Sequence, residues 1–177
     1  MDWIIFLSQL PTKPSSLRVF VWRKMRAAGA LGIQNGVWVL PDTSLQNQFL
    51  QELSATIQEQ GAGCQIFRVK PMDEEVEKDI LARFSADRKE EYEEFIEQAR
   101  LFLAEMEKES GNKKFTFAEL EENEQQLQRL EKWIEKITGR DFTGGEMKKQ
   151  AVEILDECKL NFDVFSSRVY DQHVDTP

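Results

Sequence analysis

The sequence predicts an α+β protein, in which a βαββαβ sheet part is followed by a long helix and an antiparallel helical hairpin. Two observations predict it. Through residues 1–72, apolar runs of strand length alternate with amphipathic helical patterns. From residue 73 onward, apolar residues recur every three or four positions, as they do along a helix. We therefore expect a sheet part over residues 1–72, with an acidic helical part over residues 73–177 packed on it.

The first third of the chain predicts a buried strand and a helix. WIIFLSQL is a continuous apolar run that closes at Pro11, as expected for a central strand buried on both faces. PTKPSS follows as a turn, in which Ser15 or Ser16 is placed to cap a helix over residues 17–28. Gly29 is expected to end that helix.

A hairpin, a second helix and a fourth strand complete the sheet part. Asn35-Gly36 stands between apolar flanks and predicts a type I′ turn that joins strands near residues 30–34 and 37–40. The cluster Asp42-Thr43-Ser44 caps a second helix, and CQIFRV supplies the fourth strand. The order β-α-β-β-α-β is that of the ferredoxin-like fold, which places two helices on one face of an antiparallel sheet.

The second half of the chain reads as helices. One long amphipathic helix runs from Asp73, carries Arg88 inside its apolar seam, and is interrupted at residues 110–114. Thr116 with Glu119, and Thr143 with Glu146, have the spacing of capping boxes and predict two further helix starts. The short connection between these two helices predicts an antiparallel pair.

Charge is unevenly divided along the chain. The 177 residues are 41% hydrophobic and carry a net charge of -9. Residues 1–71 hold seven basic and four acidic side chains, a charge of +3, so the remainder carries -12. No apolar run approaches the roughly 18 residues of a membrane span, and the first residues do not form a signal peptide. We expect a cytoplasmic protein that does not contact a membrane.

The residues that usually carry catalysis or bind metals are sparse. Cys64 and Cys158 lie far apart with no second ligand at metal spacing, and both fall on apolar stripes, where cysteine is usually a core residue. The single histidine, His173, lies in a tail that we expect to be frayed. The glutamate runs mostly occupy outward helix faces. We therefore expect a protein that is not an enzyme, with no metal and no cofactor.

The candidate binding surface is the first helix. Arg18, Trp22 and Arg26 align along it at four-residue spacing, where arginines can bind phosphates and an indole can stack on a base. The whole candidate site, for DNA or for an anion, consists of Lys13, Ser15, Arg18, Trp22, Arg23, Lys24 and Arg26. The competing interpretation is that these arginines pair with the surplus glutamates of the same chain. The helix also has apolar residues on more than one side, as expected if it lies between the sheet and the later helices.

Several stretches resemble a known family. WIIFLSQLPTK, the Arg18…Trp22-Arg23…Gly29-Ala30 spacing and NGVWVLP are similar to the N-terminal domain of ChrB-type chromate-resistance regulators. The likeness continues through FAELEENEQQLQRLEKWIEKITGRDF. The resemblance implies a transcriptional regulator, here in a stand-alone form without the C-terminal domain implicated in the chromate response.

At the level of the fold, the βαββαβ part also resembles the central domain of PaaX-type repressors and the Cas2-like ferredoxin folds. Cas2-type nucleases carry a metal-organising Asp at the end of the first strand. This chain has Ser8-Gln9-Leu10 there, so the likeness does not imply a nuclease. PaaX-type repressors bind DNA through a separate winged helix, which this sequence does not contain.

Together these observations predict a non-enzymatic regulatory protein that binds DNA or a partner through helix 17–28. The alternative is a module for protein–protein interaction or dimerisation that binds no nucleic acid. The expected partners are DNA, a separate C-terminal chromate-responsive protein, and a second copy of the chain as a homodimer.

Overall fold

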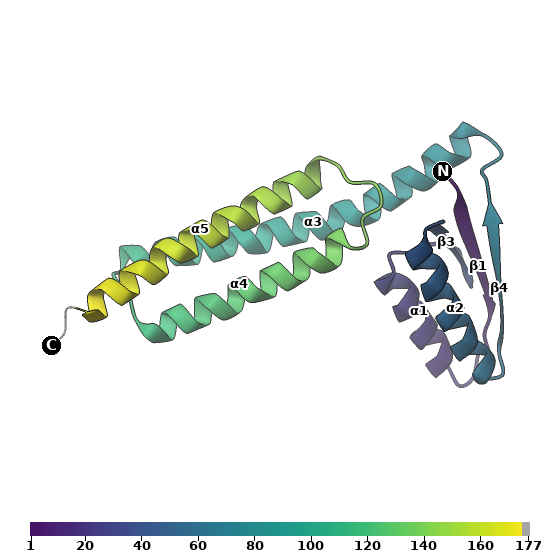
Figure 1. Ribbon diagram of the computed structural model, residues 1–177, viewed down its shortest axis with the longest axis horizontal. Coiled ribbons are helices and arrows are strands. Elements are labelled where there is room, and N and C mark those ends of the chain that lie inside the picture. The colour runs from purple at the N-terminus through teal and green to yellow at the C-terminus, as the bar shows by residue number, and fades with distance from the viewer. Residues whose placement is uncertain (175–177) are drawn as a thin grey trace. The chain divides into compact units, whose positions relative to one another are not determined.

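The computed structural model describes residues 1–174 and divides the chain into two compact units, residues 1–84 and residues 85 onward (Figure 1). The division falls inside the long helix α3, Glu74–Gly111. We refer to these parts as unit 1 and unit 2 and describe each separately.

Unit 1 is built on a four-stranded antiparallel sheet. Its strands are β1 (Trp3–Gln9), β2 (Leu31–Gln34), β3 (Val37–Pro41) and β4 (Gly63–Val69), in the order β2-β3-β1-β4. This order is that of the ferredoxin-like fold, and the predicted fold class is confirmed. β1 lies at the centre and pairs with β4 over seven consecutive residues without a register shift.

Helices α1 (Ser16–Ala27) and α2 (Ser44–Glu59) cover one face of this sheet (Figure 1). α1 buries Val21 and Met25, which are one turn apart on the same side of the helix. The α2 residues Leu50, Leu53 and Ile57 are buried in the same manner. These apolar stripes form the core of unit 1 together with buried side chains of the strands, such as Ile4, Phe6 and Leu40.

Two local expectations in unit 1 are wrong. Ser15 is the residue before α1, but its side chain makes no capping hydrogen bond. The hairpin forms at Asn35-Gly36 as predicted, yet only Gly36 has a positive φ, at 76°. A type I′ turn requires positive φ at both central residues, so the turn is of a different type. A register irregularity between Gly32 and Gln34 accompanies it.

The beginning of α3 is tied to unit 1. Phe84 stacks on Trp3, with ring centroids 5.6 Å apart. Arg83 donates a hydrogen bond of 3.0 Å to the Gly32 carbonyl. The amino group of Met1 lies 2.6 Å from the Glu77 carboxylate. Residues 74–84 therefore belong to the sheet unit although the same helix continues into unit 2.

Unit 2 is a helical bundle of the rest of α3 with α4 (Phe117–Thr138) and α5 (Glu146–Val174). α4 and α5 are antiparallel and lie side by side (Figure 1). One continuous core joins the helices, and its most buried members are Phe95, Ala99, Ile137, Ala151, Cys158, Phe165 and Val169. Burial raises the pKa of the Cys158 thiol to about 11, so this cysteine is a core residue, as predicted.

Of the two expected capping boxes, one forms in part, through its threonine only. The Thr116 hydroxyl accepts a hydrogen bond from the Glu119 amide at 3.3 Å and caps α4. Thr143 does not cap α5, which begins three residues later at Glu146. Its hydroxyl and amide both donate to Asp141, and Gly144 and Gly145 follow with positive φ, which excludes right-handed helix there.

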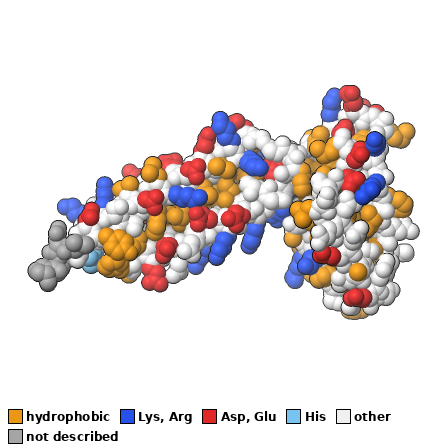
Figure 2. All heavy atoms as spheres, in the orientation of Figure 1, with side chains coloured by type: hydrophobic (Ala, Val, Ile, Leu, Met, Phe, Trp, Pro, Cys, Tyr) orange, Lys and Arg blue, Asp and Glu red, His pale blue; other side chains and the backbone are white. Residues whose placement is uncertain are grey.

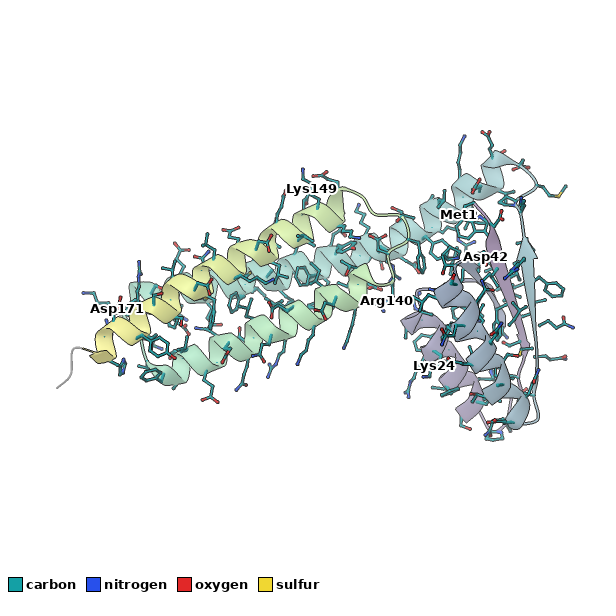
Figure 3. All side chains as sticks on the ribbon, viewed as in Figure 1. Met1, Lys24, Asp42, Arg140, Lys149 and Asp171 are labelled. Carbon is teal, nitrogen blue, oxygen red and sulfur yellow. The ribbon has the colours of Figure 1, made fainter. Side chains whose placement is uncertain are left out.

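A polar cluster holds the connection between α4 and α5 against α3. Arg88, nearly fully buried as its place in the seam predicts, pairs with Glu91, and Glu91 also accepts from Arg140 at 2.6 Å. Arg140 lies in the connection itself (Figure 3). The Tyr92 hydroxyl donates to Asp141 at 2.9 Å. Burial favours protonation of Asp141, but hydrogen bonds from the Gly144 and Thr143 amides and from Tyr92 outweigh it and lower its pKa.

The expectation of a frayed tail is wrong for the residues up to Val174, which are helical. The Nδ1 atom of His173 lies 2.8 Å from the Val169 carbonyl oxygen. The imidazole ring packs on the Phe117 ring, with the two ring centroids 4.6 Å apart. These two contacts hold the last turn of α5 in place. Residues 175–177, the end of that predicted tail, lie outside the described residues.

Candidate functional site

The predicted binding residues lie mostly on the exposed side of α1. Six of them are exposed and one, Arg26, is half-buried; the exposed residues are Lys13, Ser15, Arg18, Trp22, Arg23 and Lys24. Lys24 is labelled on α1 in Figure 3. The surface exists because α1 is held to the sheet by only one narrow stripe, Val21 and Met25. At 3.6 residues per turn, Arg23 falls on the opposite side from that stripe.

Apolar side chains share this exposed side. Val19 is 42% exposed, Phe20 36% and Trp22 53%. The helix is therefore apolar on more than one side, as the sequence indicates, and the sheet of unit 1 does not cover this second apolar side. A surface on which tryptophan and phenylalanine stand among cations can stack on flat groups as well as bind charges.

The cations of this surface are not neutralised by carboxylates. Among residues 1–174, no ion pair of 4.0 Å or less involves Lys13, Arg18, Arg23 or Lys24. The Lys24 ammonium instead lies 5.6 Å from the centre of the Phe20 ring. Within unit 1, these four residues therefore have no glutamate partner, whereas their pairing with the glutamates of the later helices, the competing expectation, stays a prediction.

A hollow of about 580 Å³ opens beside the first turn of α1. Ser15, Arg18 and Trp22 line one side of it, so the structure brings these three predicted residues together. Lys13, Arg23, Lys24 and Arg26 do not line the hollow. The predicted site thus divides into a concave part at the start of α1 and a convex basic part farther along it.

The remaining walls of the hollow come from residues that sequence reasoning did not assign to the site. They are contributed by the end of β1, the turn after it and the β2–β3 hairpin, and include Ser8, Gln9, Thr12, Asn35 and Trp38. The sequence around Asn35 predicts only a turn, and the sequence around Trp38 contains no pattern that predicts a binding site. The pairing of Trp38 with Phe6 across the sheet places it there, and that pairing joins residues 32 positions apart.

The described residues offer little for metal or nucleophilic chemistry. Among residues 1–174, no group of three or more His, Cys, Asp or Glu side chains is arranged to hold a metal ion. The Cys64 thiol lies 3.1 Å from the Ser54 hydroxyl, between β4 and α2, and Cys158 is fully buried. In the part of the chain that the structure describes, no helix is both long and apolar enough to span a bilayer.

Net charge is confined to one unit. Unit 1 carries nine basic and nine acidic side chains and is neutral, so the whole net charge of -9 belongs to unit 2. Acidic and basic side chains are interspersed over the helices of unit 2 (Figure 2). An anion that approaches α1 therefore meets a neutral unit with a local excess of cations on one helix.

Comparison with known proteins gives two matches. The family model described as "Protein ChrB, N-terminal" matches residues 18–176, which is most of the chain. Protein ChrB of Cupriavidus metallidurans (strain ATCC 43123 / DSM 2839 / NBRC 102507 / CH34) is 29% identical over 94 residues, which are 53% of this chain and 28% of that protein. The alignment thus covers a little over a quarter of the relative's length.

Proposed function

The chain belongs to the family of ChrB N-terminal domains, and on that premise we propose that it is a non-enzymatic regulatory protein that binds DNA through α1. The observation that carries the proposal is the exposed basic side of this helix. Arg18, Arg23 and Lys24 are exposed and have no carboxylate within ion-pair distance among residues 1–174. Such cations bind phosphates by releasing the counterions condensed on a duplex.

The two parts of the site suit two roles. The convex part, with Arg23 and Lys24, suits the phosphate backbone, where contacts set affinity and orientation. The concave part is lined by Arg18, Trp22 and Asn35, which carry a guanidinium group, an indole ring and an amide group. Guanidinium and amide groups read the edges of bases, so this part is the one suited to sequence preference.

The regulatory role draws on the family and on its implied link to chromate resistance. We assign the chromate response to a further domain or a separate protein, as the resemblance to the ChrB family implies. The cations of α1 are then an output surface, which binds the target, rather than a sensor.

Charge reversal on the convex part tests DNA binding. The double variant Arg23→Glu and Lys24→Glu should abolish a salt-sensitive DNA shift, because it replaces two phosphate-binding cations with anions. Each lost phosphate contact also reduces the slope of log K against log salt by about 0.9. Its melting temperature should remain close to that of the wild type, since both side chains are exposed.

A matched control is available on α4. Lys132→Glu with Lys136→Glu makes the same charge change at two exposed lysines of unit 2. This control should retain the DNA shift. Equal loss of DNA binding in both double variants would mean that only the net charge of the chain matters, and it would contradict a site on α1. Unfolding of the α1 variant would mean that Arg23 and Lys24 are structural.

A second candidate function is binding to a protein partner through the same helix, without nucleic acid. It is favoured by the exposure of Phe20 and Trp22, because aromatic side chains are enriched in protein interfaces. Titration with DNA at low salt separates the two functions. Unchanged tryptophan fluorescence of the wild-type chain would favour the protein partner, because Trp22 and Trp38 both line the hollow.

A further inference from the structure

The strand β4 forms one edge of the sheet and is uncovered along its length. It is last in the strand order, and every residue from Gly63 to Val69 is exposed or half-exposed. At its centre, Ile66 is 36% exposed and Phe67 47%. An exposed, apolar edge strand is a template for pairing with another strand.

The outward backbone groups of β4 lack partners. In an antiparallel pair, alternate residues direct their amide and carbonyl groups away from the neighbouring strand. No backbone hydrogen bond from residues 63–69 reaches any described residue outside the β1–β4 ladder. The unshifted pairing of β4 with β1 over seven residues leaves this edge regular. A second strand could therefore be added along the whole of it.

The opposite edge of the same sheet is protected. β2 has only four residues and is irregular between Gly32 and Gln34. The Arg83 guanidinium donates a hydrogen bond of 3.0 Å to the Gly32 carbonyl. Short strands, irregularities and inserted charges are the devices by which proteins block edge pairing. β4 has none of these devices, since it contains no proline and its single charge, Arg68, lies near its end.

The charges near β4 are already satisfied within the chain. Arg68 lies 3.2 Å from Asp42, and Lys70 lies 3.6 Å from Asp2. The edge is thus neutral, and it belongs to the neutral unit, whereas unit 2 carries the whole charge of -9. The same neutral edge of a second copy can approach β4 without electrostatic repulsion. A strongly charged partner would gain no electrostatic attraction at this edge.

We propose that β4 pairs with β4 of a second copy of this chain, antiparallel and about a two-fold axis. An antiparallel pair of identical strands is self-complementary, so that one edge closes the assembly as a dimer. The two sheets then form one sheet with the order β2-β3-β1-β4-β4-β1-β3-β2. Near the axis, Ile66 lies close to Ile66 of the second copy on one face of the joined sheet, and Phe67 lies close to Phe67 of the second copy on the other face.

This pairing does not depend on DNA binding, but it would have a consequence for it. A two-fold axis perpendicular to the joined sheet keeps both copies of α1 on the same face. Two α1 helices related by this axis would meet a target of two-fold symmetry, as dimeric DNA-binding proteins do.

Lysine substitution on β4 tests the proposal in the full chain. The Cys64–Ser54 hydrogen bond places Cys64 and Ile66 on the helix-covered side, so Gln65 and Phe67 lie on the other face. Phe67→Lys should weaken the dimer at least about tenfold, which is about 1.4 kcal/mol, because two ammonium groups would oppose each other near the axis. Sedimentation equilibrium without DNA measures the dissociation constant.

A matched control lies on the other edge. Ile33→Lys introduces the same charge at an apolar residue of β2 that is 41% exposed, and it should leave the dimer intact. If the Phe67→Lys variant does not fold, Gln65→Lys replaces it as the test of the β4 edge. A wild-type mass that remains at the 20.6 kDa of one chain at every concentration would overturn the proposal, and so would a dimer that withstands both β4 substitutions.

Hydrogen exchange identifies the strand directly. Alternate amides of residues 63–69 should exchange slowly when the dimer forms and rapidly on dilution, because only pairing with another strand protects them. Protection in α3–α5 in place of β4 would assign the dimer to another surface. Loss of DNA binding with the dimer retained would count against the proposed function alone.

Discussion

At the scale of single residues, the buried polar groups of unit 2 carry specific energetic consequences. Glu109 is 9% exposed and Asn123 is 1% exposed, and the Asn123 amide donates to the Glu109 carboxylate at 2.8 Å. Burial raises the pKa of Glu109, and the neighbouring carboxylates of Glu119 and Glu105 raise it further. The charged form of Glu109 is therefore disfavoured by folding.

Glu109→Gln should stabilise the protein at pH 7 by about 1 kcal/mol, because it removes a buried charge and retains an acceptor for Asn123. Since the folded pKa is raised, the contribution of Glu109 to stability is fully present below the ordinary pKa of glutamate and is lost as pH rises through the folded value. The advantage of the variant should therefore shrink as pH falls toward 4.5, the ordinary value.

Urea unfolding at neutral and at acid pH measures this difference. Glu97→Gln, at an exposed residue of α3, is the matched control for the removal of one carboxylate charge. A destabilised Glu109→Gln variant at pH 7 would mean that the charged carboxylate is required by its partners.

At the scale of elements, the helices differ in the local interaction that fixes their first residue. α4 begins at a side-chain cap, in which Thr116 accepts from the Glu119 amide. α1 begins after Ser15 without a side-chain cap, although serine is a preferred residue at this position. The start of α5 is set by the glycines before it rather than by Thr143. The same residue type therefore has different energetic weight at different helix ends.

Alanine substitution should reveal this difference. Thr116→Ala should cost about 1 kcal/mol of stability, the usual loss for a helix cap, whereas Ser15→Ala should be nearly neutral. Thermal unfolding of the two variants, followed by circular dichroism, compares them directly. Equal losses would show that Ser15 caps α1 in solution.

At the scale of the whole molecule, the uneven division of charge sets the response to salt. Unit 2 carries the net charge of -9, and like charges at high density oppose compact structure. Few of its charges are in buried pairs; Arg88 and Arg140 with Glu91 are the main exception. Repulsion between exposed carboxylates is screened by salt, while buried pairs are screened much less.

The melting temperature of unit 2 should therefore rise when sodium chloride is added from low ionic strength to about 0.15 M, where the screening length falls to about 8 Å. Trp133 lies in unit 2, against Phe95, whereas the other three tryptophans lie in unit 1. Its fluorescence in a variant that lacks the other tryptophans reports unit 2. A fall in its melting temperature with salt would show that attractive pairs outweigh repulsion.

Local patterns were sufficient for most of the fold. Apolar periodicity placed the strands and helices, and Gly29 ended α1 with a φ of 76°, because only glycine adopts that conformation without strain. The failures were also local in origin. Ser15 and Thr143 fit the statistical pattern of a cap, but a cap forms only if the side chain has no better partner, and Thr143 has Asp141, which Tyr92 of α3 also binds.

The sequence by itself determined the βαββαβ order, the helical second half and the candidate cations of α1, because periodicity and turn chemistry act over a few residues. Only the tertiary structure decided which of those residues form a surface. The hollow beside Arg18 needs Asn35 and Trp38 from a distant hairpin, and the open edge of β4 depends on no other element covering it. Exposure is set by neighbours distant in the chain, which local sequence patterns do not specify.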